Sequence, residues 1–371
     1  MRAELLFVLA AGCAFSAGVT STDAGPQPDG PPGCTSFASQ LDTCTRTSTM
    51  DITLSGMNTY DTNMGKLAMG GTQIPVTHVG LTGTDGPFDA ILVHNFHMTA
   101  SATLRATGDV PLAIIAFGSV TLDGGSLIDV TNGGAGARTM CSGGAGPGAD
   151  HSGGAGGGGG GGFGGAGAIG GMGNSDQPMS AGGTAGQASA KPHGPLGGCP
   201  GAHGGKGDDD GGAGGKPGGA IYIASATRID LAPSAGINAG GGGGDGGMRS
   251  GFPSNGDAGG GGGGSGGMIL LEAHTIRSSG ALAANGGGGG GGSGGGHSGG
   301  NGSVGLLDIG AAPGGGNNGG SGTVGGLGGA KVLIAGSSPI GVDQGGGGGG
   351  GGGAGFVIVT SSDAQLAIVS P

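Results

Sequence analysis

Hydrophobic residues recur along the chain in segments that share one pattern. Each segment opens with a β-branched or aliphatic run, passes a corner of small residues, continues with a second short apolar stretch and ends at glycine. The segments are Ala90–Gly108, Ala113–Gly134, Ala220–Gly244 and Met268–Gly290, and Phe356–Val369 repeats the two apolar stretches without the glycine. Runs rich in Val, Ile and Leu with partial alternation predict strands that stack in parallel rather than isolated hairpins.

The spacing of these repeats predicts the fold class. Ala90 and Ala113 lie 23 residues apart, close to one coil of a parallel β-helix, in which each coil adds a short strand to two or three stacked sheets. We therefore predict an all-β protein whose residues 90–371 form a right-handed parallel β-helix, or β-solenoid. Short apolar alternations in Asp51–Pro75 predict irregular coils in residues 34–89. These coils would cap the stack, because an open end exposes apolar groups and unpaired strand edges.

Three glycine-rich inserts, residues 133–218, 240–267 and 286–355, separate the later repeats. They leave the coil at one equivalent point, so we expect them on one face of the solenoid. Two interpretations stay open. The inserts could be flexible loops, because ordering glycine costs more backbone entropy than ordering any other residue. Alternatively, runs such as Gly345–Gly353 could pack side by side as extended threefold strands, a polyglycine II bundle, which is the interpretation we favour.

The N-terminus has the layout of an export signal. Residues 1–17 contain Arg2, a short apolar run and then small residues, and the run is too short to span a bilayer as a helix. The sequence before Cys13 resembles a bacterial lipobox, in which case Cys13 is lipidated. Alternatively, Ala14-Phe15-Ser16 is an ordinary cleavage site and Cys13 is discarded. Residues 18–33, rich in Pro, Gly, Asp and Ser, predict a flexible tether.

The remaining cysteines agree with export. Either cleavage leaves four cysteines, and an even number in an exported chain predicts disulfides. Of the three possible pairings we favour Cys34–Cys44, which closes a short loop, and Cys141–Cys199, which would staple the longest glycine-rich segment. Metal binding is the alternative, but the sequence has no CxxC spacing and its histidines are scattered.

Composition narrows the possible functions. Glycine provides 110 of the 371 residues, and charged residues make up only 9%, which excludes a conventional globular enzyme domain over the whole chain. Lys and Arg number 12 against 23 Asp and Glu, for a net charge of −11. A nucleic-acid partner is therefore not expected, because phosphate binding requires the opposite sign. The GxxxxGK[ST] pattern is missing, so no nucleotide cofactor is expected either.

Few residues carry candidate chemistry. Asp208, Asp209 and Asp210 follow glycines and could hold a calcium ion loosely through carboxylate and backbone oxygens, and the alternative is a solvated acidic loop. The other acids of the repeats occur singly rather than in the clusters that glycan-cleaving β-helices need. They are Asp123, Asp129, Asp230, Glu272 and Asp308. We therefore expect no catalytic site.

The lipobox-like Cys13, the cysteine-bounded start Cys34–Cys44, the run Pro111–Val130 and the junction Gly259–Ala273 carry a family resemblance. The chain resembles the glycine-rich, PE-PGRS-like exported surface proteins and lipoproteins of myxobacteria-like bacteria. Only the apolar repeat segments support the resemblance, because glycine-rich segments align with any sequence. It implies a surface protein of undefined activity and gives no functional residues.

These observations favour an exported, non-enzymatic structural or adhesive protein, either an outer-membrane lipoprotein at the cell surface or an extracellular protein. We expect its flat, glycine-rich face to contact envelope or matrix polymers, including glycans, and the membrane only through lipid on Cys13. One alternative is a carbohydrate-active β-helix enzyme, a lyase or hydrolase. A third is an ice-binding protein, because flat solenoids and glycine-rich bundles can order surface water.

Overall fold

The architecture comes from a computed structural model that describes residues 34–173, 179–249, 257–331, 333–339 and 345–371. The chain divides into two compact units, Met1–Cys34 and Thr35–Pro371, and the fold below is that of the second unit. The predicted signal region 1–17, the tether 18–33 and Cys13 lie outside the described residues. Within the described ranges every regular element is a strand, and no helix that could cross a membrane is found.

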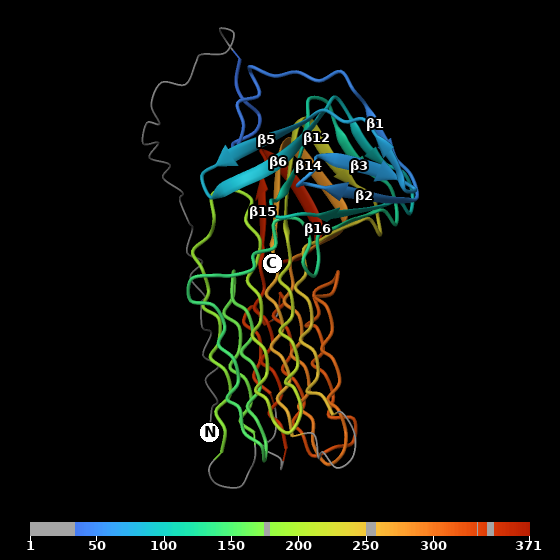
Figure 1. Ribbon diagram of the computed structural model, residues 1–371. Coiled ribbons are helices and arrows are strands. Elements are labelled where there is room, and N and C mark those ends of the chain that lie inside the picture. Colours follow the sequence, from blue (N-terminus) through green and yellow to red (C-terminus); the bar gives the residue numbers. More distant parts are fainter. Residues whose placement is uncertain (1–33, 174–178, 250–256, 332, 340–344) are drawn as a thin grey trace, which may run out of the picture. The chain divides into compact units, whose positions relative to one another are not determined.

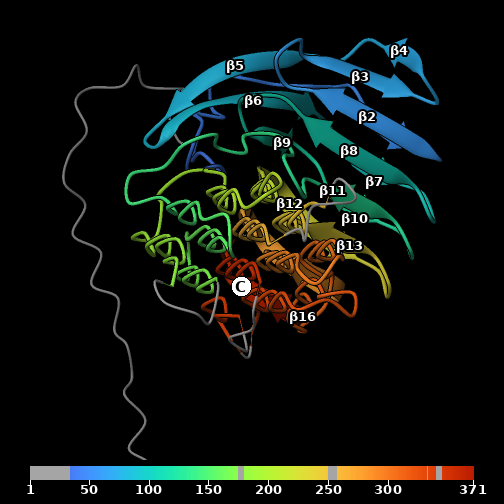
Figure 2. The same cartoon turned by 60° about the horizontal axis from the view of Figure 1, so that its bottom comes forward.

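The strands form one curled, open sheet, and the all-β prediction is confirmed (Figures 1 and 2). Eleven strands follow one another across it in the order β1-β7-β10-β12-β14-β13-β11-β8-β2-β3-β4, which curl into a half-barrel. The strands are β1 (Ile52–Leu54), β2 (Met57–Asp61), β3 (Lys66–Met69), β4 (Thr72–Ile74), β5 (His78–Gly83), β6 (Gly86–Val93), β7 (Phe96–Met98), β8 (Thr103–Thr107), β9 (Leu112–Ala116), β10 (Val120–Leu122), β11 (Leu127–Asp129), β12 (Ala220–Leu231), β13 (Gly236–Asn238), β14 (Met268–Ala283), β15 (Phe356–Thr360) and β16 (Asp363–Ser370).

Each sequence repeat contributes a strand, or part of a longer strand, to each of three parallel ladders. The opening aliphatic runs form the first ladder, β6-β9-β12-β14-β15, in which Ala113 pairs with Tyr222, Tyr222 with Leu270, and Leu270 with Ile358. The second ladder is β1-β7-β10-β12-β14-β16 and the third is β2-β8-β11-β13-β14-β16. Strands β12, β14 and β16 are long enough to serve two or more ladders. The repeats recognised in the sequence therefore stack in register.

Alternate side chains of the ladders bury two apolar clusters. The larger one lies inside the curl and contains Ile114, Ile223, Ile269 and Leu282, all fully buried. The smaller one lies on the opposite side of the first ladder, where Tyr222 packs with Phe88 in an edge-to-face pair. Residues of the N-terminal segment cover this second cluster, which includes Ala38 and Leu41. Burial on both sides explains why the opening runs are continuously apolar rather than alternating.

Residues 34–89, predicted as cap coils, contribute two parallel strands and additional antiparallel strands. Strands β1 and β2 extend the second and third ladders, whereas β3 and β4 continue from β2 as antiparallel strands, and β5 pairs antiparallel with β6. Leu67 on β3 and Tyr60 on β2 are fully buried against the larger cluster. The antiparallel strands therefore cover the apolar core at this end of the stack.

The three glycine-rich inserts leave the third ladder and return to the first. They follow β11, β13 and the end of β14, and they lead into β12, β14 and β15. Figure 1 shows their segments running side by side away from the sheet, and Figure 2 shows them nearly end-on as packed coils. Their described residues are joined by main-chain hydrogen bonds, which position the surface described next.

Candidate functional site

The glycine-rich segments bond to their neighbours with a period of three residues. In the segment 155–162, consecutive N–H groups donate to carbonyls of three different segments, and the order repeats three residues later. The bonds are Gly157 to Gly171, Gly158 to Gly260 and Gly159 to Gly146, then Gly160 to Ala168 and Gly161 to Gly263, at 2.8–3.0 Å. Three residues per turn is the repeat of the extended left-handed helix that polyproline and polyglycine adopt.

Four segments occupy the centre of the array, and each bonds to six neighbours. The segment 155–162 donates to three segments and accepts bonds from three others, through pairs such as Gly205 N–H to Gly156 O and Gly350 N–H to Gly158 O. The central segments are 155–162, 258–267, 284–294 and 345–355. Around them, hydrogen bonds link a closed ring of segments: 143–150, 197–206, 211–219, 239–248, 299–305, 312–317, 322–330, 333–339, 165–173 and 179–189. The centre is a hexagonal packing of extended chains.

Close approach explains why the central segments are almost pure glycine. A Cβ atom on Gly157 would lie 2.0 Å from the Gly348 carbonyl oxygen, and one on Gly159 would lie 1.9 Å from the Thr184 carbonyl oxygen. Both distances are far below van der Waals contact, and the atoms in the way are backbone. With three residues per turn and six neighbours, every direction is occupied along the middle of these segments, and the buried Ala and Ser residues that they contain, such as Ala155, Ser265 and Ser293, lie toward their ends.

Ring segments, by contrast, have an outer side, and every third residue carries a side chain there. In 165–173 these residues are Ala166, Ile169 and Met172, of which the last two are exposed. In 179–189 the exposed residues Ala181, Thr184 and Gln187 have the same spacing. The surface chemistry of the bundle is therefore set by one residue in three of each ring segment.

Four adjacent ring segments form a surface without charge, which we call the uncharged face. Segments 179–189, 165–173, 333–339 and 322–330 are hydrogen-bonded in that order, and they contain no Asp, Glu, Lys, Arg or His. Large apolar side chains are exposed on it: Ile169 at 58%, Ile334 at 52%, Met172 at 46% and Leu327 at 44%. A groove of about 410 Å³ follows segment 165–173, with Ile169, Met172, Thr184 and Pro339 in its lining. A few single exposed apolar residues are normal, but a contiguous group of them indicates an interaction surface.

Charged residues gather on the ring segments 197–206, 211–219 and 239–248 and the turn between the first two. They include His203, Lys206, Asp210, Lys216 and Asp245. Lys206 and Asp210 form an exposed ion pair at 3.3 Å. The bundle thus has one charged side and one uncharged side, although both are built from the same glycine scaffold.

The acidic turn contains the three aspartates that the sequence offered as a loose calcium site. Asp210 is paired with Lys206, and the Asp209 carbonyl accepts the Gly207 N–H at 2.9 Å. Across the described ranges, no group of three or more His, Cys, Asp or Glu side chains is placed to hold a metal ion. Burial, and secondarily the charge of Asp208, raises the pKa of Asp257 on an adjoining segment. The geometry therefore gives the calcium prediction for Asp208, Asp209 and Asp210 no support.

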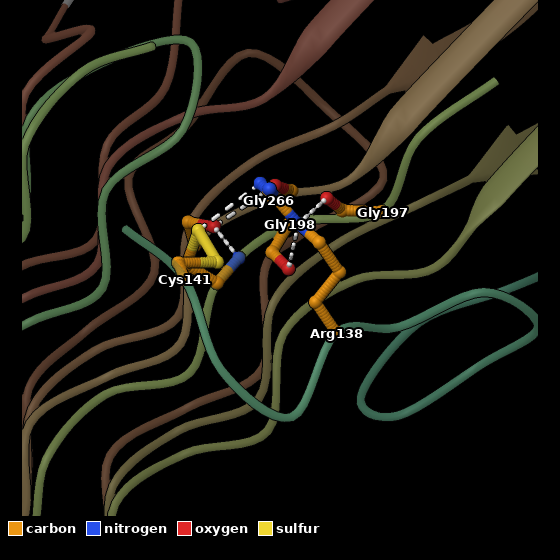
Figure 3. The surroundings of a disulfide bond; sticks show 7 residues. Arg138, Cys141, Gly197, Gly198 and Gly266 are labelled. Atoms are coloured by element: carbon orange, nitrogen blue, oxygen red, sulfur yellow. Dashed lines mark hydrogen bonds between the residues drawn. A yellow bond between two sulfur atoms is a disulfide. The ribbon is translucent and has the colours of Figure 1, made fainter. Parts of the chain in front are cut away.

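Both predicted disulfides, Cys34–Cys44 and Cys141–Cys199, are present. The second, shown in Figure 3, joins the start of the first insert to the ring segment 197–206, and its cysteines are separated by 58 positions in the sequence. Beside it the Arg138 guanidinium donates to the Gly197 carbonyl at 2.8 Å and lies over the Phe163 ring at 5.0 Å. Phe163 directly follows the central segment 155–162 and packs edge-to-face on Phe356 of β15. Bundle and sheet are therefore linked at their junction.

Two buried tyrosines each donate to a carboxylate. Tyr222 donates to Glu272 at 2.6 Å, and Ser39 donates to the same carboxylate through its N–H and its hydroxyl, at 2.7 and 2.6 Å. Tyr60 donates to Asp89 at 2.6 Å. Burial, reinforced by the carboxylate, raises the pKa of both phenols, so they stay protonated hydrogen-bond donors. Sequence reasoning missed these pairs, because their partners are 29 and 50 residues apart.

The remaining candidate acids stay apart from one another. Asp123 contacts His97 at 2.9 Å, Asp129 contacts Arg105 at 2.9 Å, and Asp230 contacts Arg228 at 2.8 Å, each as a separate pair. Asp308 accepts the N–H of Gly310, and Glu272 is held by Tyr222 and Ser39.

Comparison with protein-family models, curated proteins and solved structures finds no match to the chain.

Proposed function

We propose that this is a non-enzymatic structural or adhesive protein that contacts an envelope or matrix polymer through its uncharged face. The observation that carries the proposal is the segregation of charge on the ring. A chain with a net charge of −11 leaves six adjacent ring segments without a single charge, namely the uncharged face together with 312–317 and 299–305, and exposes Ile169, Met172, Leu327 and Ile334 on the uncharged face. An uncharged polymer such as a neutral glycan is the partner that this chemistry suits, because it needs no counter-charge.

The proposal includes a finer reading of the fold. We interpret the three parallel ladders as a short right-handed β-solenoid and the insert segments as a polyglycine II bundle. One strand per repeat in each ladder supports the first interpretation, and the threefold order of hydrogen bonds supports the second. The nine residues of Gly345–Gly353 would span roughly 28 Å at about 3.1 Å per residue, so the bundle offers a long lateral surface.

Rigidity makes this surface suitable for binding. Binding costs about 0.5–1.5 kcal/mol for each flexible side chain that is immobilised, and more for an ordered loop. The groove beside Ile169 and Met172 is built on main chain that is already held by hydrogen bonds, so a polymer lying in it orders little of the protein. The energy of apolar contact is then available for affinity.

The disulfides indicate an oxidising, extracytoplasmic environment. We propose in addition that the protein is held at the outer membrane by lipid on Cys13, with residues 18–33 as a tether. Metabolic labelling with a fatty acid would test this anchor, and a Cys13→Ser variant that remains labelled would contradict it.

A binding assay tests the proposed function. The purified protein is incubated with insoluble neutral polysaccharides, namely cellulose, chitin and a β-1,3-glucan, and the bound fraction is measured. We expect retention on at least one of them and at least a tenfold weaker association for Ile169→Asp. Ile169 is 58% exposed, so the substitution should leave the fold intact, as thermal unfolding would verify. Ala213→Asp, on the charged side, is the matched control and should bind like the wild type.

Three outcomes would refute the proposal. The first is equal binding of Ile169→Asp and wild type, which would place the contact elsewhere. The second is no retention on any polymer together with thermal hysteresis of freezing, which would favour ice binding. Release of soluble sugar from any of the polymers would favour the enzyme alternative.

A further inference from the structure

The last set of strands is paired on one side only. Strands β15 and β16 both pair with β14, and no other described strand pairs with either of them. By contrast, β12 and β14 have ladder partners on both sides. The outer edge of β15 and β16 therefore presents main-chain N–H and C=O groups in extended geometry, which is the template that a further β-strand recognises.

The apolar core is also less well covered at this edge. On β14, Leu271 and Leu282 are fully buried, whereas their register partners Val359 and Val369 are only partly buried. Two large apolar side chains of β16, Leu366 and Ile368, are 39% and 40% exposed. At the opposite end of the stack, β3, β4 and β5 add antiparallel strands beyond the ladders. Strands β1, β4 and β5 are also paired on one side only, but among the described strands of this kind only β16 exposes large apolar side chains.

The charge distribution indicates what can cover this edge. Asp363 is the only charged residue of β15 and β16, and it forms an ion pair with Arg277 of β14. Two copies of the chain, each with a net charge of −11, would repel one another through most surfaces. At this edge they would bring together only neutral or neutralised groups.

We propose that the β15–β16 edge is the interface of a homodimer, in which β15 pairs antiparallel with β15 of a second copy about a twofold axis. The same strand then serves on both sides, as a twofold interface requires. With the axis at Ile358, Val357 lies opposite Val359 of the partner, and Phe356 lies opposite its Thr360. These are apolar and β-branched cross-strand pairs of the kind that stabilise antiparallel sheets. The half-covered core residues of each copy are thereby buried. This inference is independent of the proposed function, because the uncharged face belongs to the bundle.

Measurement of molar mass in solution tests the dimer. We expect light scattering on the purified protein to give twice the mass of one chain at micromolar concentration. Thr360→Lys combined with Leu366→Lys adds positive charges to this edge of both copies, on side chains that are already exposed, and places Lys at position 360 opposite the apolar Phe356 of the partner, so it should give the monomer mass. The matched control is Thr72→Lys on β4, an exposed position at the other end of the stack, which should remain dimeric.

Cross-linking locates the interface directly. Residues that face each other in an antiparallel pair have Cβ atoms about 4.5–5.5 Å apart, so Ile358→Cys should cross-link to itself across the axis. Unchanged thermal unfolding of the lysine variants would exclude misfolding as the cause of dissociation. A wild-type protein that stays monomeric at tens of micromolar would overturn the proposal. So would a dimer that persists in the lysine variant or an Ile358→Cys protein that gives no linked dimer.

Discussion

Replacing one central glycine by alanine should unfold the bundle locally, and Gly349→Ala is the sharpest case. Gly349 lies in a central segment, and its N–H donates to the Gly290 carbonyl at 2.7 Å. An added Cβ would lie 1.9 Å from the Gly261 carbonyl oxygen and 2.8 Å from the Gly262 nitrogen. Because both are backbone atoms, no side chain can rotate away, and two segments must separate by more than about 1 Å to restore contact distance.

The expected magnitude follows from the bonds that such a separation breaks. Each hydrogen bond makes a net contribution of about 0.5–1.5 kcal/mol to the free energy of unfolding, and overpacking a tight interior costs about 1–3 kcal/mol. Loss of two bonds together with the overpacking gives a destabilisation of about 2–6 kcal/mol. About 0.4–1 kcal/mol of this destabilisation is offset, because alanine has less backbone freedom than glycine and the unfolded chain therefore loses less entropy on folding.

The matched control is Gly316→Ala in the ring. There an added Cβ would meet nothing closer than the Asn318 nitrogen at 3.9 Å, so the same chemical change should be neutral or slightly stabilising. Urea unfolding gives the free energy, and hydrogen exchange of the segment 345–355 shows where protection is lost. Equal stability of the two variants would refute the packing argument, and so would rapid exchange of these glycine amides in the wild-type protein.

Other consequences of the structure can be measured in the same way. Reduction of the Cys141–Cys199 disulfide should lower the unfolding free energy by about 4 kcal/mol on chain-entropy grounds, and a thermal midpoint unaffected by reductant would contradict this. Burial, aided by the charge of a neighbouring aspartate, raises the pKa of Asp257 above its ordinary value of 3.8. The folded protein should therefore lose stability as the pH rises from 3.8 through the raised pKa, because the ionised carboxyl is disfavoured in the folded state. Asp257→Asn should remove that loss, as urea unfolding midpoints measured between about pH 3 and 7 would show. Tyr222→Phe should cost about 1.5–3 kcal/mol because Glu272 loses a donor inside the protein, and pairing it with Glu272→Gln in a double-mutant cycle should recover part of the loss.

The apolar pattern was sufficient to find the strands of the ladders. Runs such as Ala113–Ala116 and Met268–Leu271 are continuously apolar because both sides of the first ladder are buried, and this is visible in the sequence. The antiparallel strands β3, β4 and β5 were not separated from coils, because short alternating stretches look alike in either pairing direction. The cysteine pairings were predicted because four cysteines in an exported chain allow few alternatives.

The sequence by itself determined the repeating strands, the points where the inserts leave them and the disulfides, since each depends on local spacing or on a short list of residues. Tertiary structure alone decided which glycine segments adjoin one another, and hence that Ile169, Leu327 and Ile334 share one uncharged face. The physical reason is that a glycine run has no side chains to mark its three directions. Its neighbours are selected by hydrogen bonds between segments far apart in the chain, and no local pattern records that choice.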